Sequence, residues 1–259
     1  MSNPHGTPIW YELQSHDPDA AARFYEAVVG WAIEGRPPGE VDYRMISAGA
    51  GHVGGLAGLR EGAVPPTMTP GWKVYIGVDD VDAAARALVD GGGTVMTAPF
   101  DLPGVGRMAF VADPQGTPFN LMRGATEGAE STSFSPTLPG RGSWNELSTS
   151  DQPAALAFYT GLFGWRVAGA MPMGATGDYT FLALGETPLG AAMTGQPGST
   201  PAWRFYFRVP DADAAAAAIT ANGGTVEHGP TDVPGGARVV VARDPQGAAF
   251  GVVSGGVAA

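Results

Sequence analysis

One stretch decides the fold because it occurs twice: Trp10-Tyr-Glu-Leu-Gln-Ser-His-Asp17 returns as Trp144-Asn-Glu-Leu-Ser-Thr-Ser-Asp151. Shorter motifs then follow in the same order in both halves: Phe-Tyr at 24 and 158, Gly-Trp at 30 and 164, Asp-Tyr at 42 and 178, Gly-Gly-Thr-Val at 92 and 223, and Asp-Pro-Gln-Gly at 113 and 244. Such repetition is typical of duplicated domains. We therefore predict two domains, residues 1–124 and 143–259, joined by a linker at 125–142 that is rich in Gly, Ser, Thr and Pro.

Each repeat divides into two modules with the same order of elements. In the first module, residues 9–15 alternate as a strand, Asp17 and Pro18 suit the start of a helix over 20–29, and Gly30 suits its end. Strands are expected after it at 31–34, 43–47 and 54–59. The second module is expected to have a strand at 72–78, a helix at 83–89 and strands at 94–97, 107–112 and 118–123. The chain is thus predicted to be an α+β protein of four βαβββ modules.

Two modules are needed to complete one core, since a single small sheet leaves an apolar face in water. Two facing modules would make a cup-shaped mixed sheet with the helices outside. The concave, partly polar interior of such a cup is where small ligands usually bind. The modules therefore predict one candidate ligand site in each repeat.

The composition excludes several classes of function. The 259 residues carry a net charge of −11, and no basic cluster is present that would neutralise a phosphate backbone or an anionic membrane surface. There is no cysteine, so disulfides, thiolate nucleophiles and iron–sulfur clusters are impossible. No apolar stretch has the length of a membrane span, and the first residues lack a secretory pattern. We expect a cytoplasmic protein, monomeric or homodimeric, that binds a small molecule and has no nucleic-acid or membrane partner.

The ordered set of motifs resembles the vicinal oxygen chelate superfamily, which includes glyoxalase I, bleomycin-resistance proteins, fosfomycin-resistance enzymes and extradiol dioxygenases. The resemblance is carried by the motifs given above, together with the helix start at Val78-Asp-Asp-Val-Asp82, and it covers nearly the whole chain twice. The Trp-x-Glu-Leu opening is similar to a two-domain, glyoxalase-like branch of actinobacterial proteins. The resemblance implies two tandem glyoxalase-like domains, but it does not decide the reaction, because the superfamily hosts several chemistries.

The resemblance also implies three metal-ligand positions in each repeat, usually two His and one Glu. The corresponding residues here are Trp10, Lys73 (or Trp72 in the neighbouring register) and Asn120 in the first repeat, and Trp144, Arg204 (or Trp203) and Gly251 in the second. An indole offers only an N–H donor, and a cationic side chain repels a divalent ion. The expected ligand set is therefore missing from both repeats.

The histidines do not offer a replacement site. None of the four is repeated between the halves, and they fall in the N-terminal tail, off the face of the first strand, in a Gly-rich turn and in a loop: His5, His16, His52 and His228. We therefore predict no metal ligands and no cofactor.

Other side chains are expected to occupy the cups. Residues two apart on a strand share a face, so Trp10 and Glu12 point the same way as Gln14. The candidate ligand-binding residues are Trp10, Lys73, Tyr75 and Asn120 in the first repeat and Trp144, Arg204 and Tyr206 in the second. The candidate catalytic residues are Glu12 and Glu146. A buried carboxylate without a partner is costly. We expect Glu12 to pair with Lys73 and Glu146 with Arg204, with Arg107 and Arg238 as alternative partners.

These residues have two interpretations. In the structural one, paired charges and aromatic packing hold the sheet together. In the functional one, the indoles stack on a ligand, Tyr75 and Tyr206 hydrogen-bond to it, and a buried Glu acts as a general base. For the Phe-Tyr pairs at 24–25 and 158–159, which lie on the predicted helices, we expect core packing.

Three hypotheses for function are open. The favoured one is a metal-independent, glyoxalase-like protein that binds a small carbonyl or aromatic molecule and either sequesters it or processes it by acid–base chemistry. The second is a metal-dependent glyoxalase or dioxygenase, hence a lyase or an oxidoreductase, with ligands at unusual positions such as Glu12, His16, His52 or His228. The third is a non-catalytic interaction protein whose cups are filled by its own side chains.

Overall fold

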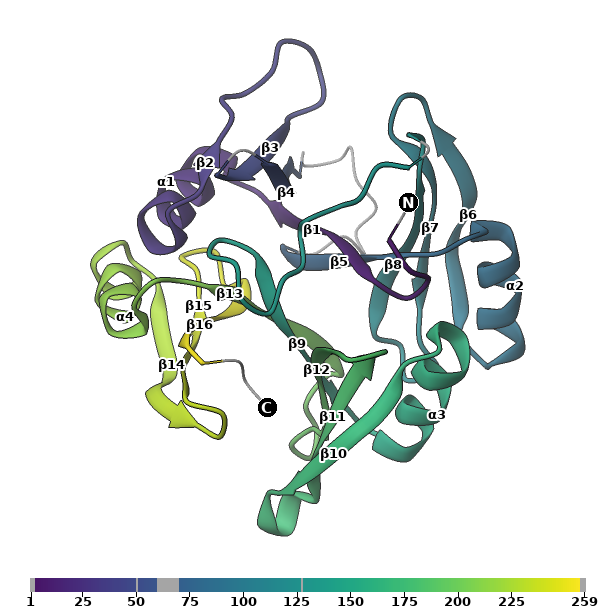
Figure 1. Ribbon diagram of the computed structural model, residues 1–259. Coiled ribbons are helices and arrows are strands. Elements are labelled where there is room, and N and C mark those ends of the chain that lie inside the picture. Colours follow the sequence, from purple (N-terminus) through teal and green to yellow (C-terminus); the bar gives the residue numbers. More distant parts are fainter. Residues whose placement is uncertain (1–2, 50, 60–69, 127, 257–259) are drawn as a thin grey trace. The chain divides into compact units, whose positions relative to one another are not determined.

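The computed structural model describes residues 3–49, 51–59, 70–126 and 128–256; residues 1–2, 50, 60–69, 127 and 257–259 lie outside the described part. The chain passes four times through one order of elements, a strand, a helix and three further strands (Figure 1). The predicted four βαβββ modules are therefore confirmed. No helix in the described ranges combines the length and apolar character needed to cross a membrane.

In the first two modules the bounds lie within about three residues of the predicted ranges, except that the strand predicted at 94–97 extends to Leu102. The first module comprises β1 (Pro8–Ser15), α1 (Pro18–Val29), β2 (Ala32–Ile33), β3 (Tyr43–Ala48) and β4 (Gly51–Gly58). The second comprises β5 (Gly71–Gly77), α2 (Val81–Asp90), β6 (Thr94–Leu102), β7 (Gly106–Ala112) and β8 (Pro118–Gly124). The third comprises β9 (Gly142–Thr149), α3 (Gln152–Phe163), β10 (Arg166–Pro172), the short helix η1 (Gly174–Thr176), β11 (Asp178–Leu184) and β12 (Thr187–Thr194). The fourth comprises β13 (Ala202–Arg208), α4 (Ala212–Ala221), β14 (Thr225–Val233), β15 (Ala237–Arg243) and β16 (Ala249–Gly255).

The signals that start and end the first helix act as predicted. The Asp17 side chain accepts a hydrogen bond from the Ala20 backbone N–H at 2.9 Å, which satisfies one of the free donors of the first turn of α1. Gly30 closes the helix with a left-handed backbone (φ 81°), a conformation that costs glycine little. The helix α3 is capped in the same way by Asp151 and Gly164.

The strands form two mixed sheets with the same order. The first is β2-β3-β4-β1-β5-β8-β7-β6, and the second is β10-β11-β12-β9-β13-β16-β15-β14. The pairs β1/β4 and β5/β8 are parallel, whereas β3/β4 and β7/β8 are antiparallel. The predicted fold class, two tandem domains with mixed sheets, is therefore confirmed.

Glycine is required where the parallel strands approach each other most closely. A Cβ on Gly190 of β12 would lie 1.8 Å from the carbonyl oxygen of Asn145 on β9, and a Cβ on Gly54 of β4 would lie 2.4 Å from that of Tyr11 on β1. Any larger residue would push these strands apart.

The chain clusters into two compact units that do not follow the two repeats. Unit 1 comprises Met1–Ile9, Val74–Ser131 and Trp144–Trp203, and unit 2 comprises Trp10–Lys73, Thr132–Ser143 and Arg204–Ala259. Unit 1 thus combines most of the second and third modules, and unit 2 most of the first and fourth. Within unit 2, α1 lies beside α4 (Figure 1). The domain boundaries predicted from the repeats stay a prediction.

The Phe-Tyr and Asp-Pro-Gln-Gly motifs meet inside each unit. In unit 2, the buried Tyr25 hydroxyl donates to Asp244 Oδ2 at 3.2 Å and accepts from the Trp72 indole N–H at 2.9 Å. In unit 1, the buried Tyr159 hydroxyl donates to Asp113 Oδ2 at 3.1 Å. The expected core role of these tyrosines is confirmed, and each joins two modules that belong to different repeats.

Candidate functional site

The first cluster of candidate residues lies in unit 2, on β1 and β3. Trp10 and Glu12 leave β1 on the same face, and Glu12 is buried. The Trp10 indole N–H donates to the Tyr43 hydroxyl at 2.9 Å, and this hydroxyl hydrogen-bonds to the Glu12 carboxylate. Gln14 Nε2 donates to Glu12 Oε1 at 3.1 Å. Two neutral donors, Tyr43 and Gln14, therefore bind this carboxylate.

The second repeat builds the same arrangement in unit 1, on β9 and β11. The Trp144 indole N–H donates to the Tyr179 hydroxyl at 2.8 Å, and that hydroxyl donates to Glu146 Oε2 at 2.9 Å. Trp144 and Glu146 are both buried. We call each set of three residues a Trp–Tyr–Glu cluster: Trp10, Tyr43 and Glu12 in unit 2, and Trp144, Tyr179 and Glu146 in unit 1.

The two clusters differ in the residue that lies opposite the glutamate. Gly55 of β4 pairs with Glu12, and a Cβ at Gly55 would lie 2.1 Å from the Tyr43 hydroxyl oxygen. In the second repeat Ala191 of β12 pairs with Glu146 and carries such a Cβ. The space around the tyrosine hydroxyl therefore differs between the two clusters.

Burial and charge keep the first tyrosine protonated. Burial raises the pKa of Tyr43, and the negative charge of Glu12 raises it further, because both disfavour a phenolate. Tyr43 therefore remains a hydrogen-bond donor at neutral pH. Its hydroxyl can stabilise the ionised form of Glu12, because a charge-assisted hydrogen bond is stronger than a neutral one.

Lys73, on the neighbouring strand β5, is half-buried in the same unit. Burial lowers its pKa, while the charge of Glu12 acts in the opposite direction. The structure shows this electrostatic effect of Glu12 on Lys73, and the predicted pairing of the two side chains stays a prediction.

The two alternative cationic partners, Arg107 and Arg238, bind other carboxylates. Arg107 binds Asp82 at the start of α2 with a closest distance of 2.6 Å. Arg238 binds Asp213 at the start of α4 at 2.7 Å. These arginines leave their strands toward the helices, where exposed carboxylates at the helix N-termini attract them, rather than toward a glutamate of a cluster.

The remaining candidate residues occupy two further places. In unit 1, Tyr75 of β5 lies opposite Asn120 of β8, and both are buried. In unit 2, the Tyr206 ring lies over Gly251, where a Cβ would come within 2.2 Å of a ring carbon, so the missing side chain makes room for the ring. Arg204 is half-buried on the same strand as Tyr206.

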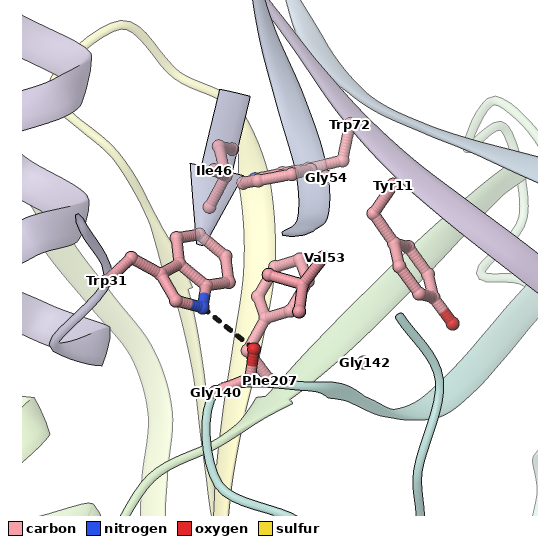
Figure 2. Close-up of a pocket in the computed structure, with 9 residues that line it drawn as sticks. All are labelled: Tyr11, Trp31, Ile46, Val53, Gly54, Trp72, Gly140, Gly142 and Phe207. Carbon is pink, nitrogen blue, oxygen red and sulfur yellow. Dashed lines mark hydrogen bonds between the residues drawn. The ribbon is translucent and has the colours of Figure 1, made fainter. Parts of the chain in front are cut away.

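The interior of unit 2 is filled with aromatic rings. Tyr11, Trp31, Trp72 and Phe207 line a crevice that is too narrow to hold a water molecule (Figure 2). The Trp31 indole N–H donates to the Gly140 carbonyl oxygen at 2.8 Å, so a residue of the predicted linker closes this core. The crevice is packed core and has no room for a ligand.

Sequence reasoning missed Tyr43 and Tyr179, the central members of the two clusters. The signal was present, because the Asp-Tyr pair at 42–43 recurs at 178–179. The pair was used only as evidence of duplication. A hydroxyl on one strand that reaches a carboxylate on a strand two places away in the sheet leaves no periodic mark in the sequence.

Comparison with known proteins identifies the family. The model of the Glyoxalase/Bleomycin resistance protein/Dioxygenase superfamily matches residues 8–121 and again residues 143–252. The chain belongs to this family. Both matches span a complete pair of modules, which agrees with the resemblance carried by the motifs.

Several relatives match along almost the whole chain. The chain is 40% identical over 252 residues to "Putative glyoxylase CFP32" of Mycobacterium tuberculosis, covering 96% of this chain and 94% of that protein. It is 36% identical over 262 residues to "Anthracycline biosynthesis protein DnrV" of Streptomyces peucetius, covering 96% and 93%. Among solved structures, the Mn(II)-bound glyoxalase of Novosphingobium aromaticivorans superposes with a TM-score of 0.67 at 18% identity, covering 97% of this chain and 83% of that one. At this identity the structure shows a shared fold alone.

The residues at the family's usual ligand positions do not fit a divalent ion. The Trp10 and Trp144 indoles each donate their N–H to a tyrosine and have no lone pair to offer. Lys73 is a donor, and Gly251 has no side chain, which leaves the amide oxygen of Asn120. Within the described residues, no three His, Cys, Asp or Glu side chains gather in a way that could hold a metal.

Proposed function

We propose that each Trp–Tyr–Glu cluster forms the floor of a site for a small organic molecule that carries a carbonyl or aromatic group, and that the protein binds it without a metal ion of its own. The observation that carries this proposal is the repeated hydrogen-bond chain from an indole N–H through a tyrosine hydroxyl to a buried carboxylate. The names of the relatives, a glyoxylase and an anthracycline biosynthesis protein, support a small organic ligand.

A role in stability alone would not require these residues. A buried carboxylate is expensive to desolvate, and apolar residues of similar size are often at least as stable in such a place. Both repeats nevertheless carry the glutamate at the matching position, and Glu12 and Glu146 are only 7% and 8% exposed. A buried carboxylate at matching positions of both repeats, in spite of its desolvation cost, supports a role in ligand binding.

Each member of a cluster has a distinct part in binding. The glutamate accepts a hydrogen bond from a ligand hydroxyl or enol, or takes up an acidic proton next to a carbonyl group. The tyrosine hydroxyl positions the carboxylate, and the hydroxyl is itself held in position because it also accepts a hydrogen bond from the indole N–H. The indole, with its single donor used, offers its ring face for stacking.

A thermal-shift screen with aromatic aldehydes, ketones and phenols tests the binding proposal. A true ligand at about 1,000 times its Kd stabilises the protein by roughly 4 kcal/mol. Glu12→Gln and Glu146→Gln keep the size of each side chain and remove the charge, so we expect them to weaken or abolish the shift without loss of the fold. Gln246→Glu, a change near the start of α1, serves as a charge control outside the clusters. A screen without any shift, or shifts unchanged in both glutamine variants, would overturn the proposal.

Metal analysis tests the second half of the proposal. Protein purified without chelator should contain no stoichiometric zinc, nickel, manganese or iron, and added divalent ions should not change its melting temperature. A stoichiometric metal that disappears in Glu12→Gln or Glu146→Gln would show that the carboxylates are ligands. That result would favour the metal-dependent glyoxalase or dioxygenase hypothesis.

A further inference from the structure

One hydrogen-bond acceptor beside the first Trp–Tyr–Glu cluster is buried without a donor. Gln14 lies on the same face of β1 as Trp10 and Glu12, and it is only 5% exposed. Its Nε2 donates to Glu12 Oε1 at 3.1 Å. Its Oε1 is also buried, and no donor within the described ranges hydrogen-bonds to it. Buried polar atoms nearly always have a partner, so this oxygen calls for an explanation.

The orientation of the Gln14 amide follows from its contact with Glu12. If the two ends of the amide were exchanged, its oxygen would lie 3.1 Å from a carboxylate oxygen, and both atoms are acceptors. The nitrogen therefore faces the carboxylate, and the oxygen is the atom without a donor. The nitrogen and oxygen of an amide are about 2.2 Å apart, so this oxygen lies within roughly 5.5 Å of Glu12 Oε1. The acceptor thus belongs to the surroundings of the first cluster.

The second repeat fills the corresponding place without an amide acceptor. Ser148 matches Gln14 and is paired with Met193 of β12, whereas Gln14 is paired with Ala57 of β4. A long and a short side chain have therefore changed places between the repeats. An apolar side chain would supply the bulk at lower cost, because burial of an amide oxygen without a partner is unfavourable. A buried acceptor is what distinguishes the first repeat at this position.

We propose that Gln14 selects the ligand of the first site by accepting a hydrogen bond from a hydroxyl or N–H group of that ligand. This inference rests on the proposed function, because the ligand is the one bound at the cluster of Trp10, Tyr43 and Glu12. It adds a requirement, since a group that cannot donate leaves the acceptor unpaired. The second site has no such requirement, because the Ser148 hydroxyl can either donate or accept.

The burial of the acceptor determines the size of the expected preference. An exposed acceptor gives up water when it meets a ligand donor, and this loss cancels most of the gain. Gln14 Oε1 has almost no exposed surface before a ligand binds, so its desolvation is already part of the free protein. Trp10 is half-buried and marks the more open end of this face, so a ligand enters there and the side chains over the Gln14 oxygen move aside. We expect a ligand hydroxyl to tighten binding about tenfold.

Isothermal titration calorimetry with two matched pairs of probes tests the proposal. The probes are 3′- and 4′-hydroxyacetophenone and the corresponding methylacetophenones, in which a methyl group of similar size replaces the hydroxyl. The protein carries Glu146→Gln to weaken the second site, so the first site dominates the titration. At least one hydroxyl probe should bind about tenfold more tightly than its methyl partner, although the methyl group is the more hydrophobic.

Three variants show whether Gln14 causes the preference. Gln14→Met, which introduces the side-chain type of Met193, should remove the preference for the hydroxyl probe. Gln14→Leu should do the same, so a folding defect in one variant, detected by circular dichroism, does not decide the result. Ser148→Ala is the matched control in the second repeat and should leave the preference unchanged.

The outcomes distinguish this inference from the proposed function. Equal affinities within both probe pairs would overturn the role of Gln14 and leave binding at the first cluster intact. A preference that persists in folded Gln14→Met or Gln14→Leu would also overturn it, because another residue would then recognise the donor. Binding of none of the four probes would overturn this inference, whereas the thermal-shift screen decides the proposed function separately.

Discussion

Replacing Tyr179 by Phe removes one oxygen from the centre of the second cluster and should cost measurable stability. The hydroxyl accepts from the Trp144 indole at 2.8 Å and donates to Glu146 Oε2 at 2.9 Å. A neutral hydrogen bond contributes about 0.5–1.5 kcal/mol and one to a charged group about 1.5–3 kcal/mol. The variant should therefore lose about 2–4 kcal/mol in the free energy of unfolding, with little change in packing.

Urea unfolding followed by tryptophan fluorescence and by circular dichroism measures this loss. Tyr43→Phe is the matched variant in the first cluster, where the indole-to-hydroxyl distance is 2.9 Å. A double-mutant cycle that combines Tyr179→Phe with Glu146→Gln isolates the hydroxyl-to-carboxylate term, and we expect a coupling of about 0.5–3 kcal/mol. A loss below about 0.5 kcal/mol in both phenylalanine variants, with no coupling, would refute the hydrogen-bond chain as the feature that holds the carboxylate.

Two further predictions concern the frame around the clusters. Gly190→Ala should lower the free energy of unfolding by about 3 kcal/mol or more, because its Cβ would lie 1.8 Å from the Asn145 carbonyl oxygen. Gly161→Ala, in open space on α3, should instead raise the free energy of unfolding by about 0.5–1 kcal/mol. Changes in melting temperature of the same sign in the two variants would contradict this prediction. Tyr25→Phe should lower the free energy of unfolding more near pH 7 than near pH 3. Burial raises the pKa of Asp244, so the fold loses stability as the pH rises through the folded-state pKa of this carboxyl group. The Tyr25 hydrogen bond lowers that pKa, so the loss of stability should be larger when the hydroxyl is removed. A cost that is equal or larger in acid would show that Asp244 is not the coupled group.

Local signals predicted the elements well because their causes lie within a few residues. Asp17 caps α1 and Gly30 ends it, as their positions indicate, since a cap needs only the neighbouring backbone N–H groups. Alternation along β1 likewise placed Trp10 and Glu12 on one face. These inferences use distances along the chain that the helix and strand geometries determine.

The donors that bind the buried glutamate were not predicted. Opposite charges suggested Lys73 for Glu12, and the charge of Glu12 does act on Lys73, but the hydrogen bonds from Tyr43 and Gln14 were missed. These hydrogen bonds depend on which side chains reach the same point across two strands, and this is decided by the packed sheet. Sequence reasoning considered charge and could not estimate that reach.

The sequence by itself determined the four modules and their order, because duplication, capping and alternation act locally. The tertiary structure decided which modules pack together and which atoms meet. Tyr25 of the first module donates to Asp244 of the fourth, and Tyr179 joins Trp144 to Glu146. Such contacts bring together residues far apart along the chain, and only the packed strands and helices set the distances between them.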